Sequence, residues 1–423
     1  MADHTSPEAG SPMYASSLDR LRPGAVLGRT VYDEAGRPLL VAGTTLTPRY
    51  LDALRRRGLY AVHVRDGVAD DVVPDDLVSD RVRSTLTTHL STTFGRVEHI
   101  AAERGDDDRG VEGAIDHLGE QPLELGDRVV ATIEALYADV EVLITELLEN
   151  DAIAGLESLK THNEYTFQHS VDVAVVGVLL GRHLGLPVDR LRELAFGCLL
   201  HDIGKTYIDR LILDKPGPLT PAEFAAIREH PRMGFELVRR MPVRSLLPAH
   251  VAYQHHEKQG GGGYPRGLVG DNTVASRCVE ERVGAGRMLL IAEIGAVADV
   301  YSALTSDRPY RPALPPDQVL DKLSGMAGSH LNREIVRALR RFVPSYPVGR
   351  WVEVTRGPHV GWRGVVTAVH RGEVDRPTIR LVLDGRGEEL ADPPEVDTRR
   401  APGIGLACLA PNEVPTDRLV AAG

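Results

Sequence analysis

The sequence has little cysteine, few aromatic side chains and no excess of positive charge. Its three cysteines, Cys198, Cys278 and Cys408, are too far apart for a CxxC pair and too few to crosslink a secreted scaffold. We therefore expect no disulfide framework and a reducing, cytoplasmic compartment. The formal net charge of -11 argues against sequence-independent binding of nucleic acid, because such binders need Lys and Arg to displace the counterions of the phosphates. No DNA partner is expected.

Long hydrophobic runs are also missing. The longest apolar stretch, Val173 to Leu180, is bounded by Asp172 and Arg182 and is far shorter than the ~20 residues that span a bilayer. The polar N-terminus lacks the basic-then-apolar layout of a secretory signal. The sequence thus predicts no membrane span.

Local patterns divide the chain into five segments and predict a mainly α fold. Residues 1–20 are expected to be a disordered tail, and 21–74 a small β-rich module around the helix TPRYLDALRRRG, with Thr47 as its N-cap. A helical linker or bundle follows over 75–159, and a mainly helical domain over 160–343. The last segment, 344–423, reads as a small antiparallel β domain and tail, with predicted strands at 351–355, 364–369 and 378–383.

One helix of the 75–159 segment carries an apolar stripe. Its apolar residues recur three and four positions apart, at Val130, Ile133, Tyr137, Val140, Ile144 and Leu147. Such a stripe must be covered, either by the following domain or by a second copy in a homodimer. No strict heptad runs long enough to decide between the two.

Histidine is unevenly distributed. Eight of the 16 histidines fall between Thr161 and Glu257: His162, His169, His183, His201, His230, His250, His255 and His256. Core packing does not explain this bias, whereas metal ligation does.

The strongest local signal is the run Leu199 to Lys205, an apolar helix that abruptly presents His201, Asp202 and Lys205. Adjacent helical residues point about 100° apart, so His201 and Asp202 reach one metal only near a helix end or irregularity, which Gly204 supplies. The remaining candidate ligands lie elsewhere, at His169, His230, His255, His256 and Asp299. Six or seven nitrogen and oxygen ligands without thiolate suit a two-metal catalytic site of iron, manganese or zinc.

These motifs carry a family resemblance. His201-Asp202 with Gly204-Lys205, then KPGPLT, His230-Pro231, HHEKQGGGGYP and ADVYSALTSDRPYR occur in the order found in the HD-GYP subgroup of the HD-domain metal-dependent phosphohydrolases, which 160–342 resembles. The resemblance implies an HD-type helical bundle as the catalytic domain. Residues 21–65 and 346–390 are similar, more weakly, to accessory regions found beside such domains.

The resemblance implies hydrolysis of cyclic di-GMP to linear pGpG, and leaves open a second step to GMP, by a metal-bridging hydroxide that attacks phosphorus. It implies two divalent ions, iron or manganese. By position, His169, His201, Asp202 and Asp299 match the ligands of one ion, and Asp202 bridges to a second ion held by His230, His255 and His256. Asp202 and Lys205 match catalytic positions, and Lys205, Tyr264, Arg308 and Arg311 match substrate contacts.

Four departures from the family pattern qualify this assignment, and one of them, Ser302 in place of a common Asp, is given little weight. Gly260 replaces a common Asp and gives four consecutive glycines, so we expect a flexible loop before Tyr264. Tyr165 stands where three-metal members place Glu, which predicts a two-metal centre. Residues 271–288 form an apparent insertion and are expected to be an inert surface loop.

Two alternatives to a cyclic di-GMP phosphodiesterase remain. One is a catalytically weak receptor that binds the nucleotide, or a signalling protein, through the Gly263-Tyr264-Pro265 face. The other is a hydrolase of another cyclic nucleotide or dinucleotide. The full ligand set favours an enzyme, because seven buried metal-type ligands are costly to keep without metal.

Overall fold

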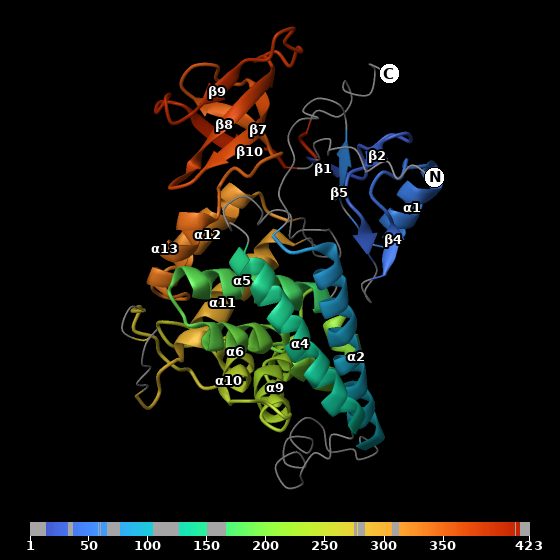
Figure 1. Cartoon of the computed structure of the whole chain (residues 1–423), viewed down its shortest axis with the longest axis vertical. Helices are drawn as coiled ribbons and strands as arrows, with labels where there is room; N and C mark the ends of the chain where they lie inside the picture. Colours follow the sequence, from blue (N-terminus) through green and yellow to red (C-terminus); the bar gives the residue numbers. More distant parts are fainter. Residues whose placement is uncertain are drawn as a thin grey trace, which may run out of the picture.

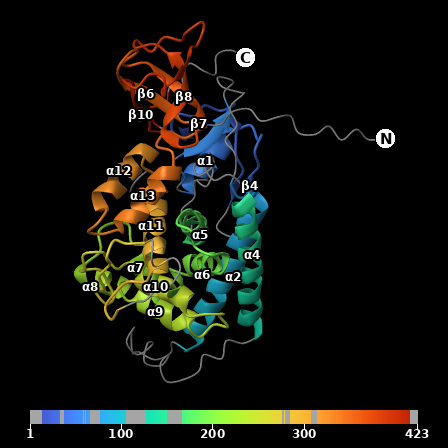
Figure 2. The same cartoon turned by 60° about the vertical axis from the view of Figure 1, so that its left-hand side comes forward.

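The computed structural model describes residues 14–32, 37–57, 59, 61–65, 77–104, 127–149, 166–274, 277, 284–306, 313–410 and 412–414. A helical body occupies one end, and the N-terminal module and a C-terminal sheet lie side by side at the other (Figure 1). The same arrangement is visible from the side (Figure 2). Among the described residues, no helix combines the length and the apolar composition that a bilayer crossing needs.

The N-terminal module is built from short strands and one helix. Strands β1 (Tyr14–Ser17), β5 (Ala61–Arg65) and β2 (Val26–Leu27) form an antiparallel sheet in that order, and β3 (Val31–Tyr32) pairs with β4 (Pro38–Leu40). Helix α1 (Pro48–Arg56) begins as predicted, with the Thr47 hydroxyl accepting from the Tyr50 N–H at 3.3 Å.

The expected disordered tail over 1–20 is wrong at its end. Tyr14–Ser17 form β1, which pairs with β5 in the register Ser17 to Ala61. This strand is polar, so its pattern gave no strand signal, but ladder hydrogen bonds come from the backbone and need no apolar side chain. Leu18 then enters the core directly after the strand.

The C-terminal sheet confirms the β texture predicted there. It consists of β6 (Trp351–Arg356), β7 (Arg363–His370), β8 (Glu373–Leu383), β9 (Glu395–Asp397) and β10 (Gly405–Cys408). All neighbours are antiparallel, in the order β10-β6-β7-β8-β9.

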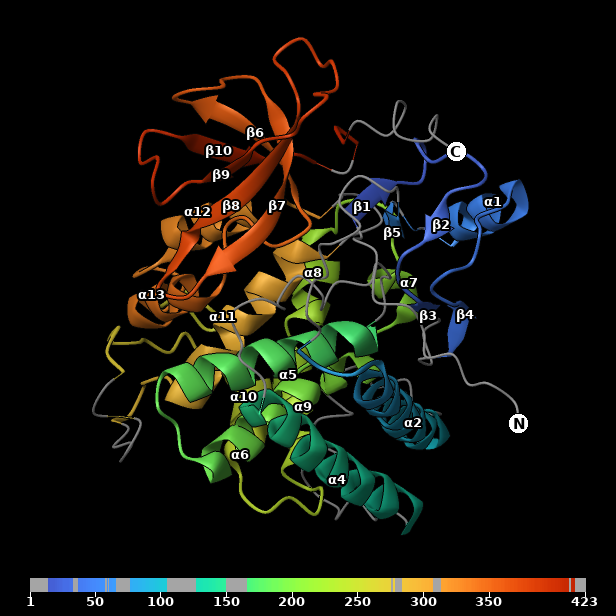
Figure 3. The same ribbon diagram turned by 45° about the horizontal axis from the view of Figure 1, so that its top comes forward.

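The N-terminal module and the C-terminal sheet share an apolar cluster, which the sequence did not indicate. Trp351 of β6, 1% exposed, packs in this cluster with Val382 of β8 and with Leu27, Leu46 and Val64 of the N-terminal module. Two segments from opposite ends of the chain therefore bury side chains against each other. Figure 3 shows them above the helical body.

The helical body surrounds a central helix. Helix α5 (Thr166–His183) is buried on nearly all sides from Ser170 to Gly181, as expected for a helix whose sequence is apolar all round. Its neighbours include α6 (Val188–Leu199), α11 (Leu290–Thr305) and α13 (Arg333–Phe342). The remaining long elements of the described part are α2 (Asp80–Arg104), α4 (Asp127–Glu149), α9 (His230–Val238), α10 (Leu247–Gln254) and α12 (Pro316–Met326).

The apolar stripe of α4 is covered within the chain. Helix α4 packs against α2, α5 and α6, and Ile133, Val140, Ile144 and Leu147 are buried in the main core. Tyr137 stacks on Phe196 of α6, with ring centroids 4.1 Å apart and planes 4° from parallel. Of the two alternatives that the sequence left open, the structure has the intramolecular one.

Candidate metal centre

The seven predicted metal ligands come from five places in the helical body. His169 lies in the first turn of α5, His201 and Asp202 follow α6, His230 begins α9, His255 and His256 follow α10, and Asp299 lies in α11. Ligand atoms of His169, His201 and Asp299 lie within 4.8 Å of one another, as do those of His230, His255 and His256. The fold thus gathers residues that are up to 130 positions apart in sequence.

The backbone changes direction where His201 and Asp202 occur, as their adjacency required. Helix α6 ends at Leu199, and a short 3-10 helix, η1 (Ile203–Tyr207), begins after Asp202. Gly204 is needed there for close approach, since a Cβ would lie 2.0 Å from the His230 carbonyl oxygen and 2.6 Å from the Gly234 nitrogen. The sequence argument located the irregularity correctly, but its cause is contact with α9 rather than the backbone freedom of glycine.

Asp202 lies between the two histidine groups. Its Oδ2 is 3.4 Å from His201 Nε2, and its Oδ1 is 3.4 Å from His230 Nε2 and 3.9 Å from His255 Nε2. A carboxylate in this position has one oxygen available to each group. The geometry fits the bridging role that the family resemblance implies.

Backbone carbonyls fix the orientation of three imidazoles. Nδ1 of His201 donates to the Cys198 carbonyl at 2.7 Å, Nδ1 of His230 to Ile227 at 2.6 Å, and Nδ1 of His255 to Ala252 at 2.9 Å. Each ring therefore directs its Nε2 inward, the arrangement that ligating histidines use.

The surroundings of these three Nε2 atoms favour a cation. His201 Nε2 is buried and has no hydrogen-bond partner within the described part of the chain. His230 Nε2 and His255 Nε2 lie 3.2 Å apart, although both are acceptors when their Nδ1 atoms carry the protons. Lone pairs that face each other inside a protein are stabilised by a shared metal ion. The residues present therefore fit bound metal.

His169 is oriented differently. Its Nε2 lies 3.0 Å from Asp299 Oδ1, and its Nδ1 lies 2.9 Å from Ser302 Oγ. Ser302, one of the departures from the family pattern, was assigned no role from the sequence. In the structure its hydroxyl orients the His169 ring from one helical turn beyond Asp299.

Burial keeps most of the histidines in the cluster neutral. It lowers the pKa of His230 and that of His256 to about 3, and holds the pKa of His255 well below its usual range. For Asp202, burial opposes ionisation, but the Lys205 ammonium and His201 outweigh it and hold the pKa of the carboxyl well below its ordinary value. Neutral imidazoles and ionised carboxylates are the protonation states that bind metal.

Lys205 and Tyr264, two predicted substrate contacts, border the cluster. Lys205 Nζ donates to Asp202 Oδ2 at 2.6 Å and stays one-third exposed. The Tyr264 ring stacks on His256, with centroids 4.7 Å apart. Arg228, which sequence reasoning missed, places its guanidinium 4.9 Å from the centroid of the Tyr264 ring. Its position two residues before His230 was the available signal.

The loop of four glycines is tied down, so the expected flexibility is wrong. The Gly260 N–H donates to the Ser329 carbonyl at 2.7 Å, and the Gln259 N–H donates to the His330 carbonyl at 3.1 Å. Gly263 lies so close to Glu257 that a Cβ would be 2.5 Å from its Cα. The loop is therefore held by neighbouring backbone.

The buried carboxylate of Glu257 supports the turn that carries Tyr264. It accepts from the backbone N–H groups of Arg266 and Leu268 at 2.7 and 2.8 Å. Within the predicted insertion 271–288, Arg277 reaches the buried carboxylate of Glu293 at 3.0 Å. Glu293 precedes Asp299 on α11, so Arg277 contacts a helix that carries a predicted ligand.

Some predicted positions are not part of the described cluster. Arg308, Arg311, Tyr165, His162 and Cys278 lie outside the described residues. His183 packs on Phe342 and His250 on Phe235, away from the ligand groups. Both histidines were expected to have no part in metal binding.

A family comparison decides the class of this domain. Residues 166–304 match the model of the HD domain family. The chain carries an HD domain. The matched range begins with α5 and ends in α11, so it contains all seven candidate ligands of the HD domain, from His169 to Asp299.

Three curated proteins are similar to part of this chain. The cyclic di-GMP phosphodiesterase PA4108 of Pseudomonas aeruginosa is 34% identical over 62% of this chain and 58% of its own length. The 3'3'-cGAMP-specific phosphodiesterase 3 of Vibrio cholerae is 35% identical over 46% of this chain and 38% of its own. The cyclic di-GMP phosphodiesterase response regulator RpfG of Xanthomonas campestris is 37% identical over 39% and 40%. The chain thus spans about half the length of these relatives or less.

Proposed function

We propose that the HD domain hydrolyses cyclic di-GMP to the linear dinucleotide pGpG. The observation that carries this proposal is the position of Asp202, whose two oxygens each lie 3.4 Å from a histidine of a different ligand group. The names of the relatives support a cyclic dinucleotide as the substrate, and two of the three contain cyclic di-GMP.

Two divalent ions fit this ligand set. His169, His201 and Asp299 would hold one, His230, His255 and His256 the other, and Asp202 both. Imidazole and carboxylate without thiolate favour iron or manganese at such a centre. When bound, the ions would supply Lewis acidity toward the phosphate and a water that is ionised near neutral pH.

The protein's own side chains would bind and orient the substrate. Lys205 is one-third exposed beside Asp202 and can donate to a non-bridging phosphate oxygen, where negative charge grows during hydrolysis. Arg228 and Tyr264 form an adjacent polar and aromatic face, suited to a phosphate and to a guanine ring. Cationic groups at this place allow an acidic protein to bind an anionic substrate.

Product analysis tests the proposal. Full-length protein loaded with manganese or with iron under anaerobic conditions is incubated with cyclic di-GMP and, separately, with 3'3'-cGAMP, and products are separated by chromatography. We expect pGpG from cyclic di-GMP, its loss in Asp202→Asn, and its retention in His99→Ala, an exposed histidine on α2. A second peak of GMP would show that hydrolysis continues. No linear product from cyclic di-GMP by metal-loaded protein overturns the assignment.

A receptor role is the second candidate, favoured by the Tyr264 and Arg228 face at the edge of the cluster. It requires tight binding of cyclic di-GMP with turnover no faster than that of Asp202→Asn. Metal analysis of the same samples tests the two-ion assignment, and three ions per chain would contradict it.

A homodimer and a signalling partner at the Gly263-Tyr264-Pro265 face stay predictions.

A further inference from the structure

A cavity lies between the helical body and the C-terminal sheet, away from the metal centre. Its walls come from the C-terminal ends of α5 and α13 and from the turn and first residues of β8. Its volume of about 930 Å³ is that of a pocket for a small organic ligand. Boundaries between parts of a fold are common places for such pockets.

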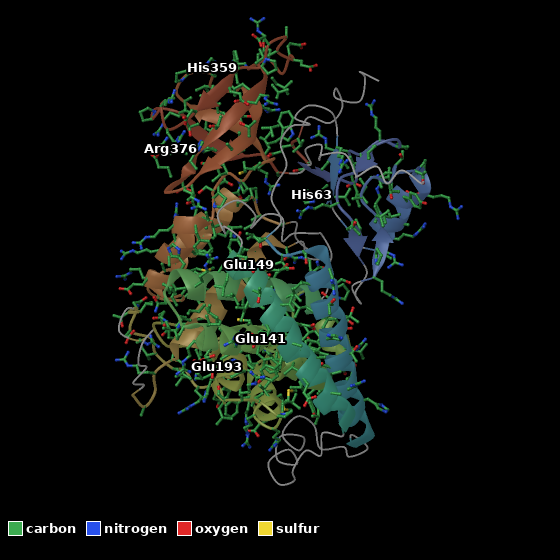
Figure 4. All side chains as sticks on the ribbon, in the orientation of Figure 1. His63, Glu141, Glu149, Glu193, His359 and Arg376 are labelled. Carbon is green, nitrogen blue, oxygen red and sulfur yellow. The ribbon has the colours of Figure 1, made fainter. Side chains whose placement is uncertain are left out.

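Positive charge converges on this cavity from three elements. Arg182 of α5, Arg340 and Arg341 of α13, and Arg376 of β8 all line it. Figure 4 labels Arg376 on the C-terminal sheet. Two carboxylates, Glu373 and Asp375, also line it. Asp375 is engaged by Ser345, whose hydroxyl donates to it at 2.5 Å. Four guanidinium groups around one cavity are unusual in a chain with a net charge of -11.

Local structure accounts for two of the four arginines. Arg182 donates to the Leu147 carbonyl, and Arg340 donates to the Ser324 hydroxyl at 2.7 Å and lies 3.5 Å from Asp321. Basic residues in the last turn of a helix also complement its dipole. These contacts give Arg182 and Arg340 a structural role that needs no ligand.

Arg341 and Arg376 are not accounted for in this way. Within the described ranges the side chain of Arg341 makes no hydrogen bond or ion pair, and that of Arg376 makes one long contact, 3.4 Å, with the Ile404 carbonyl. The His183 ring packs on Phe342, with centroids 5.2 Å apart and planes tilted by 40°, and both residues line the cavity. Guanidinium groups that retain free donors beside an aromatic wall match a phosphate attached to a base.

We propose that this cavity binds a phosphate-bearing nucleotide at a site separate from the metal centre. His183 lies 14 residues after His169 on α5, which places the two about 21 Å apart along the helix (14 residues at about 1.5 Å each). The same helix thus carries a candidate metal ligand near one end and the nucleotide pocket at the other. This inference does not depend on the proposed hydrolysis.

Equilibrium binding to the full chain tests the pocket. GMP, GTP and linear pGpG are titrated by calorimetry into Asp202→Asn protein, and inorganic phosphate is titrated as the probe for simple anion binding. The same titrations are made with a double variant that carries Arg341→Glu and Arg376→Glu in addition to Asp202→Asn. The matched control is Arg337→Glu, an exposed arginine of α13 that does not line the cavity.

At least one nucleotide is expected to bind, and its affinity is expected to fall about tenfold or more in the double variant but not in the control. Circular dichroism and thermal melting establish that all variants are folded; if the double variant is not, Arg341→Gln with Arg376→Gln replaces it. Absence of nucleotide binding, or equal binding by the double variant and the control, overturns the proposal. Binding of inorganic phosphate alone overturns the nucleotide assignment.

Discussion

The ammonium group of Lys205 donates to Oδ2 of Asp202 at 2.6 Å. Lys205 lies three residues after Asp202, and its positive charge balances the negative charge of the buried carboxylate. A metal ion bound to Asp202 would balance that negative charge instead. The ammonium of Lys205 could then turn toward a substrate phosphate. The two roles of Lys205 make opposite predictions for metal binding and for turnover.

Lys205→Met is expected to lower kcat for cyclic di-GMP by about a hundredfold, because one preorganised donor to the developing charge is lost. Metal affinity is expected to equal or exceed the wild-type value, since the competing cation has been removed. Both are measured on one preparation, with Lys322→Met, an exposed lysine of α12, as the control. Wild-type kcat in Lys205→Met would exclude a role for the ammonium in the reaction.

Gly204→Ala is expected to destabilise the fold by about 3 kcal/mol or more, because its Cβ would overlap the His230 carbonyl. Thermal and urea unfolding measure the effect, and metal binding should weaken in parallel because His230 must move. Gly325→Ala in α12, where a Cβ has nothing within 4 Å, is the control and should be neutral or stabilising by about 0.5–1 kcal/mol. Equal stability of the two variants would contradict the close approach.

The pH dependence of α8 (Pro221–Ile227) follows from Glu223. Hydrogen bonds from Lys215 and from the Thr220 N–H lower the pKa of Glu223 to about 2. Because this pKa is depressed, the carboxylate's contribution to stability is fully present above its usual range near 4.5 and is lost as the pH falls toward 2. An NMR titration of Glu223 should give the low value and Lys215→Met should raise it. An unchanged pKa in that variant would exclude the lysine as its main cause.

Trp351→Ala is expected to loosen both ends of the chain together. Trp351 lies in the cluster shared by the N-terminal module and the C-terminal sheet, and removal of a buried Trp costs about 3–5 kcal/mol. Hydrogen exchange should show lost protection in β5 as well as in β6 and β7, with α5 and α11 unaffected. Loss confined to the C-terminal sheet would contradict a shared cluster.

The sequence by itself determined which residue types are available for metal binding. The histidines, the carboxylates and the adjacency of His201 and Asp202 led to the prediction of a metal site, and the resemblance of the motifs to the HD-GYP subgroup led to the prediction of an HD domain. Periodic patterns likewise located α1, α5 and the strands β6 to β8, whose burial follows local sequence. Strand β1 was not predicted, because its residues are polar and backbone pairing with β5 requires no apolar pattern in the sequence.

Tertiary structure decided what depends on contacts between distant segments. It brings α9 close to Gly204 and places the Ser302 hydroxyl beside His169. It also provides the backbone hydrogen bonds that hold the glycine loop at Gly260. It also placed Arg228 over Tyr264, joined the two β-rich parts through Trp351, and gathered four arginines around one cavity. None of these contacts can be predicted from local sequence patterns. Each one joins residues that are distant in sequence and are brought together only by packing.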